Sequence, residues 1–204
     1  MDDIKEQSVP AIFEKFKFNI KKISRHGKLI LRSMHLGSHS AHFISRLLLS
    51  LVLQGTLKHL DLTNNALGDP GIKALSASLA GPCPLISLNL SSNNLTPLGA
   101  APLFKALRTN QTLVHLNLSS DVESNSCNKL GPSGARSLAK LLETQRYLAI
   151  VNVKGNAIGN EGMQALCLAM GPNGGHIESL NVERNMVGPK GAKDMVEAIR
   201  RGEC

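Results

Sequence analysis

Aliphatic residues alternate with polar ones in a pattern that returns about every 28 residues through most of the chain. The first clear copy reads Leu57-Lys-His-Leu60-Asp-Leu62-Thr-Asn-Asn65-Ala-Leu67. The copies begin at Leu57, Leu85, Leu113, Leu148 and Ile177, which gives spacings of 28, 28, 35 and 29 residues. The alternation around Leu60 and Leu62 predicts a short strand with one buried face. A regular period of this length predicts a solenoid, in which stacked units bury a continuous core.

Each copy continues with a glycine and then an apolar stripe at helical spacing. Each glycine lies four residues after the last apolar residue of the strand pattern, which is Leu67 in the first copy. The glycines are Gly71, Gly99, Gly134, Gly162 and Gly191. In the first copy Ile72, Leu75 and Leu79 come next, at the spacing of one buried helix face. Prolines lie where four of the helices would begin, a position that tolerates a missing N–H: Pro70, Pro97, Pro132 and Pro189. Every copy is therefore predicted to form a strand, a tight loop and a helix.

An asparagine follows the strand pattern of every copy. These residues are Asn65, Asn93, Asn128, Asn156 and Asn185. We predict that they stack as a ladder, because their amides can bond loop backbone that lacks a strand partner. The third copy carries seven extra residues, Asp121–Cys127, before its asparagine. This insertion is interpreted either as a recognition loop at one edge of the sheet or as a tolerated surface loop.

The pattern over residues 57–199 resembles the ribonuclease-inhibitor-like subclass of leucine-rich repeats, which has a period of about 28 residues and a full helix in each repeat. The resemblance implies an α/β leucine-rich repeat solenoid, a right-handed β-α superhelix with a parallel concave sheet and convex helices. It implies about five full repeats and a degenerate N-terminal one.

The N-terminal quarter of the chain keeps only part of the pattern. Leu29-Ile-Leu31 echoes Leu60-Asp-Leu62, but Met34 stands where the ladder asparagine is expected. Apolar residues at helical spacing between positions 10 and 23 predict an amphipathic helix before it. The predicted division is an N-terminal amphipathic helical cap (1–25), a degenerate capping repeat (26–56) and leucine-rich repeats (57–204). No comparable cap is recognisable after Ile199, and we expect a partner or further repeats to cover that side.

Composition narrows the classes of function. Hydrophobic residues make up 42% of the chain and aromatic residues 3%, with no Trp and one Tyr. So few aromatic residues argue against a stacking platform for single-stranded nucleic acid. The net charge is +8, of which residues 1–50 supply +5, from nine Lys and Arg against four Asp and Glu. Binding of nucleic acid or an anionic membrane through residues 15–32 is therefore kept as a minor alternative.

Cysteine spacing and the N-terminal residues bear on location. The four cysteines, at 83, 127, 167 and 204, include no C-x-x-C pair, which favours reduced thiols. The N-terminal residues show no basic-then-apolar leader. The longest apolar run, residues 47–53, is far shorter than the ~20 residues of a membrane helix. We expect a cytoplasmic protein with no membrane span, and leave a nuclear, ciliary or cytoskeletal location open.

Signatures of catalysis and of metal binding are missing from the sequence. It contains no Gly-rich phosphate loop, H-E-x-x-H or G-x-S-x-G motif. His35 and His39 have helical spacing, but Gly37 between them weakens the geometry of a zinc site. Asp121 and Glu123 are too few carboxylates for a cation site. We predict no enzymatic activity, no cofactor and no metal.

The predicted function is that of a non-enzymatic protein–protein interaction scaffold or a subunit of an intracellular assembly. Its partner is expected to be a protein, within a larger complex. The repeats also resemble those of Ran-type GTPase-activating proteins and of the sensor half of NOD-like receptors, and ciliary and cytoskeletal subunits use the same repeat. A regulatory fragment and a ciliary or cytoskeletal subunit are therefore the alternatives. The candidate partner contacts are Asp121, Glu123, Lys154, Glu183, Arg184, Met195 and Ile199.

Overall fold

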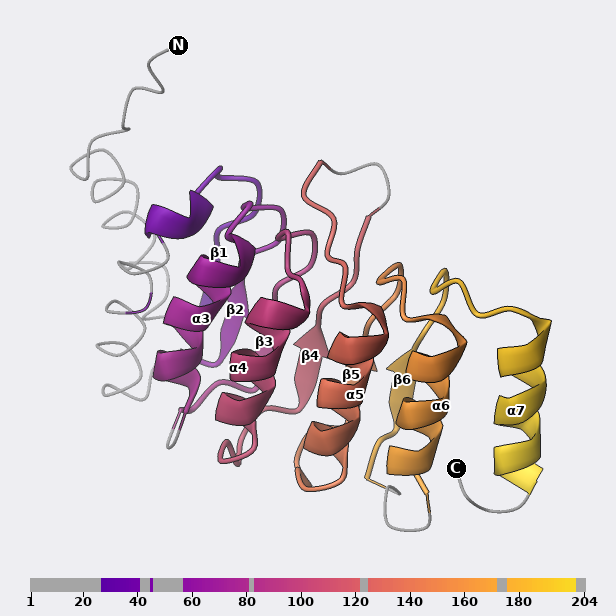
Figure 1. Cartoon of the computed structure of the whole chain (residues 1–204). Helices are drawn as coiled ribbons and strands as arrows, with labels where there is room; N and C mark the ends of the chain where they lie inside the picture. The colour runs from indigo at the N-terminus through magenta and orange to yellow at the C-terminus, as the bar shows by residue number, and fades with distance from the viewer. Residues whose placement is uncertain are drawn as a thin grey trace.

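Strands and helices alternate along the chain in the computed structural model (Figure 1). The structure describes residues 27–40, 45, 57–80, 83–121, 125–171 and 176–200. The strands are β1 (Lys28–Ile30), β2 (His59–Asp61), β3 (Ser87–Asn89), β4 (His115–Asn117), β5 (Ile150–Asn152) and β6 (Ser179–Asn181). The helices are α3 (Gly68–Leu79), α4 (Pro97–Leu107), α5 (Gly131–Leu142), α6 (Gly159–Ala169) and α7 (Pro189–Arg200). The predicted cap, residues 1–25, lies outside the described residues, so this division stays a prediction.

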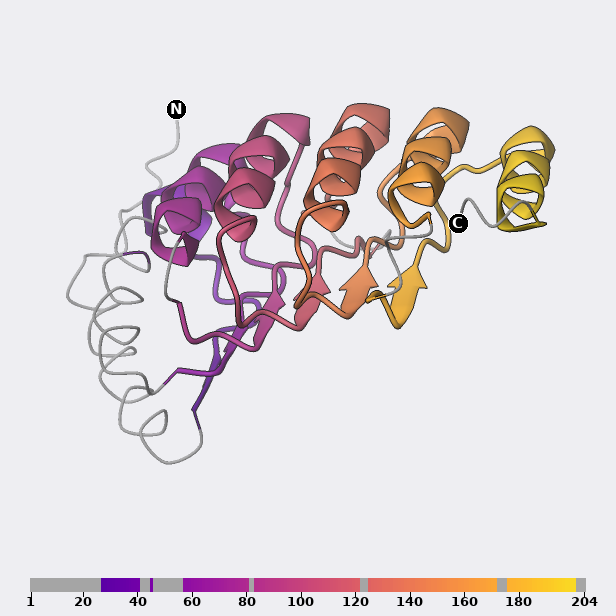
Figure 2. The same cartoon turned by 90° about the horizontal axis from the view of Figure 1, so that it is seen from below.

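The strands form one parallel sheet in the order of the sequence, β1 to β6. Equivalent positions of successive repeats are paired, as in Leu60 with Leu88 and Leu88 with Leu116. Figure 2 shows the helices as one layer and the strands as a second layer on the inner side of the arc. The predicted α/β solenoid, with a parallel concave sheet and convex helices, is confirmed.

The core lies between the two layers and is built from aliphatic side chains. The middle residue of each strand points into it, and Leu60, Leu88 and Leu116 are at most 2% exposed. The helices contribute their apolar stripe, in which Ile72, Leu75 and Leu79 of α3 are buried. Burial of each such side chain stabilises the fold by about 1.5–3 kcal/mol. The aliphatic core between the two layers is therefore a major source of stability.

The loop from strand to helix takes a left-handed backbone on both sides of the ladder position. Ser92 (φ 52°) and Asn94 (φ 57°) flank Asn93 in this way. The same conformation recurs around Met34, at Ser33 (φ 52°) and His35 (φ 50°). Left-handed backbone is unfavourable for residues with a Cβ. The loops therefore need an interaction that holds them.

The buried asparagine amides supply this interaction. The Asn93 side chain accepts from the backbone N–H of Asn65 (3.1 Å) and donates to the carbonyls of Leu62 (2.8 Å) and Ser91 (3.0 Å). Asn93 thus bonds both its own loop and the preceding one. Equivalent bonds from Asn65, Asn156 and Asn185 join the other repeats. The ladder is a continuous row of amides that ties each loop to its neighbour.

The insertion leaves this row unbroken. The Asn128 side chain accepts from the backbone N–H of Asn93 and donates to the carbonyl of Leu90. Near the base of the insertion, Asp121 N–H donates to the Ser92 hydroxyl, and the Cys127 thiol donates to the carbonyl of Asp121. The chain therefore departs from the repeat pattern at the insertion and returns to it at the ladder position, Asn128.

The glycines in the first turn of α4, α6 and α7, which are Gly99, Gly162 and Gly191, allow each of these helices to approach the preceding helix closely. A Cβ on Gly162 of α6 would lie 2.8 Å from the Cβ of Ala135 in α5. Such a distance is shorter than any ordinary carbon–carbon contact. At these three positions the glycine reflects the close approach of neighbouring helices.

A second set of buried amides joins the loops that lead from helix to strand, and the sequence pattern did not reveal it. Asn110 accepts from the backbone N–H of Leu113 (2.8 Å), and Gln145 accepts from that of Leu148 (3.0 Å). Gln145 also donates to the carbonyl of Asn110 (2.7 Å). Side-chain amides thus hold the loops at both ends of the strands.

Replacing Asn93 with Ala should lower the free energy of unfolding by about 1–3 kcal/mol, because buried backbone groups lose their partners. Asn181→Ala is the matched control, since the Asn181 side chain accepts from the backbone N–H of Glu183 at the half-buried end of β6. It should cost less than Asn93→Ala. Urea denaturation followed by circular dichroism measures both, and equal stabilities of Asn93→Ala and the parent would refute a structural ladder.

Deletion of residues 121–127 should leave the fold intact, because it restores the 28-residue spacing and joins Ser120 directly to Asn128. The measurement is the far-ultraviolet circular dichroism spectrum and the melting temperature of the deletion variant. Loss of helical signal or aggregation would show that the insertion is required for folding.

Candidate functional site

The concave face is lined by polar side chains whose hydrogen bonds are largely internal. One column of the sheet consists of Asp61, Asn89, Asn117, Asn152 and Asn181. The Asn117 side chain accepts from the backbone N–H of Ser119 at 3.0 Å, and the same bond recurs two residues after each of the other four. This geometry closes a local turn. The column therefore shapes the strand ends and offers few unused acceptors to a partner.

Asp61 departs from the asparagines of its column and forms an ion pair. Its Oδ2 lies 2.6 Å from Arg32, which follows β1, and its Oδ1 accepts from the Thr63 hydroxyl. Burial acts to raise the pKa of the Asp61 carboxyl, but the hydrogen bonds from Arg32 and Thr63 outweigh it and lower the pKa. Asp61 is therefore ionised and neutralised by its neighbour.

The C-terminal end of the face carries the charged residues predicted as contacts. Lys154 Nζ lies 2.5 Å from Glu183 Oε2, and the hydrogen bond from Lys154 lowers the pKa of the Glu183 carboxyl. The pair bridges the loops after β5 and β6. Arg184 follows directly, exposed and with a left-handed backbone (φ 55°). The structure brings these three residues together in one surface, here called the charged end.

The other predicted contacts lie elsewhere. Asp121 is exposed at the base of the insertion, after β4. Glu123 lies outside the described residues. Met195 is half-buried in α7, on the convex layer, and the side chain of Ile199 is not described. The predicted set therefore does not form a single site, and the contact role of each member stays a prediction.

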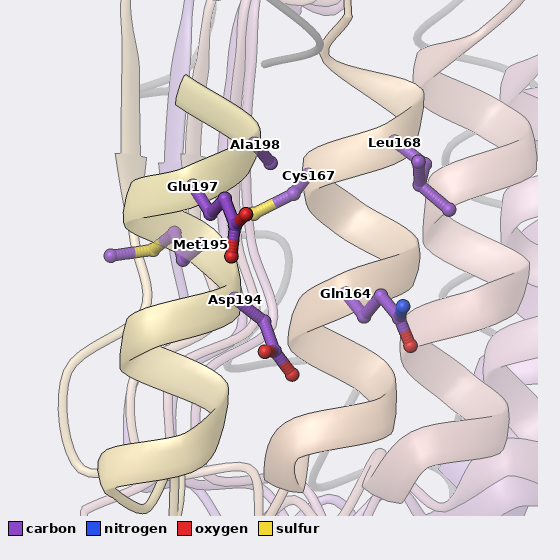
Figure 3. Close-up of a pocket in the computed structure, with 7 residues that line it drawn as sticks. All are labelled: Gln164, Cys167, Leu168, Asp194, Met195, Glu197 and Ala198. Atoms are coloured by element: carbon purple, nitrogen blue, oxygen red, sulfur yellow. The ribbon is translucent and has the colours of Figure 1, made fainter. Parts of the chain in front are cut away.

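A cavity of about 180 Å³ lies between α6 and α7 (Figure 3). The Cys167 and Glu197 side chains point toward each other across it, whereas Met195 points away from α6. The remaining lining residues are Gln164, Leu168, Asp194 and Ala198. Ligand pockets typically enclose about 300–1,000 Å³ with mostly apolar walls. This cavity is smaller and carries two carboxylates, so it does not have the features of a small-molecule site.

A row at the N-terminal end of the concave face was only partly visible in the sequence. The paired positions are Lys28, His59, Ser87 and His115, on strands β1 to β4. The repeat pattern puts His59 and His115 at equivalent positions of their copies, but Lys28 lies in the degenerate repeat, where the pattern is weak. Leu29 is equivalent to Leu60, so Lys28 is equivalent to His59. This correspondence could have assigned Lys28 to the row from the sequence.

The described residues offer little for metal chemistry or membrane insertion. Within the described ranges, no three His, Cys, Asp or Glu side chains converge as a metal site would require. None of the helices among these residues has the length and apolar character needed to cross a bilayer. The arrangement can present charges and hydrogen-bonding groups to another macromolecule.

Comparison with known sequences identifies repeats and a group of relatives. A family model described as "Leucine Rich repeat" matches residues 56–76, 81–104 and 144–167. "NACHT, LRR and PYD domains-containing protein 14" of Mus musculus is 48% identical over 66 residues, or 32% of this chain. Protein 4C of the same name and organism is 28% identical over 177 residues, or 86% of this chain. The chain spans 7% and 14% of the length of these two relatives.

Solved structures share the fold at low sequence identity. "Leiomodin-1 Actin-Binding Site 2 (ABS2)" has a TM-score of 0.61 and 19% identity, with 93% of this chain and 97% of that chain covered. The tropomodulin C-terminal domain of Caenorhabditis elegans has a TM-score of 0.55 and 16% identity, with 81% and 92% covered. These likenesses establish the architecture.

Replacing Arg32 with Gln should reduce the loss of stability on acidification. The pKa of Asp61 is lowered in the fold, so the ion pair stabilises the fold fully above the ordinary pKa of 3.8, and this contribution is lost as the pH falls through the folded value. Because the Arg32 side chain is 61% exposed, we expect an effect of at most about 1 kcal/mol between pH 7 and pH 3. Urea titrations at both pH values measure it. Arg136→Gln, which removes an exposed convex pair with Glu161, is the control and should leave the difference unchanged.

Proposed function

Because this chain is a leucine-rich repeat protein with the α/β solenoid fold, we propose that it is a non-enzymatic interaction module that binds a protein partner on its concave face. It would serve as a scaffold or as a subunit of an assembly. Fold alone does not name the partner, so the proposal depends on the surface.

The charged end is the observation that carries this proposal. In the column of Thr63, Ser91 and Ser119, the last two repeats place Lys154 and Glu183 instead. Charged residues at these positions add nothing to the core, and exposed ion pairs contribute little stability. Arg184 beside them is a residue type that often dominates binding energy in interfaces. A rigid sheet that presents such residues side by side is suited to recognition of a protein surface.

A regulatory role within a longer receptor-like protein is the second candidate. It is supported by identities of 41–48% to segments of several NACHT, LRR and PYD domains-containing proteins. Mass spectrometry of the endogenous polypeptide distinguishes the two candidates. Peptides from a nucleotide-binding domain in the same covalent chain would support the receptor fragment, and their absence at full coverage would support the separate module.

A cytoskeletal role is supported more weakly, because one structural neighbour is named for an actin-binding site and the likeness extends to the fold alone. Cosedimentation of the chain with filamentous actin tests this alternative. The GTPase-regulating alternative has no comparable support and stays a prediction from the repeat pattern.

Arg184→Gly should weaken partner binding without unfolding the chain. Glycine adopts the left-handed backbone of this position without strain, so the free energy of unfolding should change by less than about 1 kcal/mol. Proteins captured from native cells by the parent and by the variant are compared by quantitative mass spectrometry. We expect the specific partner to fall at least fivefold, and Lys154→Glu should have the same effect.

Met186→Gly is the matched control, because Met186 is 80% exposed and has the same left-handed backbone (φ 58°) two residues further on. It should retain the partner. Equal capture by all the variants, or loss with Met186→Gly alone, would contradict binding at the charged end.

A further inference from the structure

The opposite end of the concave face carries a row of cationic and titratable side chains. Lys28 pairs with His59, His59 with Ser87, and Ser87 with His115. Adjacent strands lie about 4.8 Å apart, so the row spans about 14 Å from Lys28 to His115. The buried residues Leu29, Leu60, Leu88 and Leu116 each follow a member of the row and point into the core. The row itself, here called the histidine row, therefore faces the concave side.

The charges around the row favour an anion. Burial lowers the pKa of His59, and the positive charge of Lys28 and the neighbouring His115 lower it further. Lys58 precedes His59, and Arg32 follows β1. The nearby carboxylate, Asp61, is paired with Arg32. The facing positions on β3, β4 and β5 are neutral: Ser87, Asn89, Asn117, Ile150 and Asn152. Among the described residues of this end, the positive charge of Lys28 and Lys58 has no carboxylate paired with it in the strands.

We propose that the histidine row binds an extended acidic segment of a partner protein, and that His59 and His115 take up protons as the segment binds. This inference rests on the proposed function and names the chemistry of the partner. A negative charge over the row favours the protonated imidazole of His59, which Lys28 disfavours in the free chain. Binding therefore strengthens as the pH falls through the histidine range.

The size of the row suits a peptide. An extended chain advances about 3.3 Å per residue, so side chains at i, i+2 and i+4 on one face span about 13 Å. Three acidic residues at alternate positions therefore match the distance from Lys28 to His115. A nucleic acid is a poorer fit, because its binding depends on neutralising many phosphates with Lys and Arg, and the row itself contains a single lysine, Lys28. The half-buried Ile150, which pairs with His115 in the same row, also suits apolar atoms of a peptide better than a phosphate backbone.

The test uses the purified 204-residue chain and a nine-residue peptide of alternating Glu and Ser with a pH-insensitive rhodamine label. Fluorescence anisotropy at constant ionic strength gives the dissociation constant at pH 7.5, 6.5 and 5.8. Glutamate stays ionised over this range, since its ordinary pKa is about 4.3. We expect binding to tighten about tenfold from pH 7.5 to pH 5.8, as two histidines become protonated. A peptide of alternating Gln and Ser should not bind.

The variants separate the row from the rest of the surface. His59→Gln and His115→Gln should each remove a large part of the pH dependence, whereas the exposed His39→Gln, outside the sheet, should leave it unchanged. Lys28→Met should weaken binding at pH 7.5 and shift the pH profile upward, because His59 loses its cationic neighbour. Melting temperatures verify that the variants are folded.

Several outcomes would overturn the inference. These are pH-independent binding, equal loss with His39→Gln, or tighter binding of a labelled oligothymidine through the same histidines. If the glutamate peptide fails while partner capture still depends on Arg184, the acidic segment is wrong and the interaction module stands. If the peptide binds as expected but capture is insensitive to Arg184→Gly and Lys154→Glu, the binding role of the charged end fails.

Discussion

The hydrogen bonds of the buried asparagine ladder are the constraint on which the rest of the structure depends. Most strand-to-helix loops contain left-handed residues, as at Ser92 and Asn94, and a short chain path cannot satisfy its own buried backbone groups. The amide of Asn93 satisfies groups in two loops at once. Neighbouring repeats must therefore stay in register. This explains why the insertion in the third repeat returns to the ladder at Asn128 before the helix begins.

The same regularity limits where function can reside. Side chains that follow the repeat, such as Asn117 and Asn152, are occupied by bonds to their own strand ends. Specific recognition must come from positions that depart from the repeat. On the described concave face these departures gather at two ends: Lys28 and His59 on the first strands, and the Lys154–Glu183 pair with Arg184 on the last.

The fold was largely predictable, because period, strand alternation and the ladder asparagines are all local signals that every copy repeats. The buried amides of Asn110 and Gln145 escaped prediction, because they occupy different residue types in a loop without a shared pattern. The site was predictable only in part. Lys154 lies close to Glu183 because the two residues occupy equivalent positions of neighbouring repeats. Met195 is separated from both because it belongs to the helix layer, whereas they follow strands of the sheet.

The two ends of the concave face differ in how their charge is balanced, and this difference constrains a partner that covers both. Lys154 and Glu183 neutralise each other, so the charged end can offer hydrogen bonds in either direction, and Arg184 gives it one net positive charge. At the histidine row the positive charge of Lys28 opposes protonation of His59. An opposite charge that arrives with a ligand would favour protonation there. In the proposed binding mode, a partner that lies along the sheet would bring its negative charge to β1–β4 and a mixed polar surface to β5 and β6, and this would set the direction in which it binds.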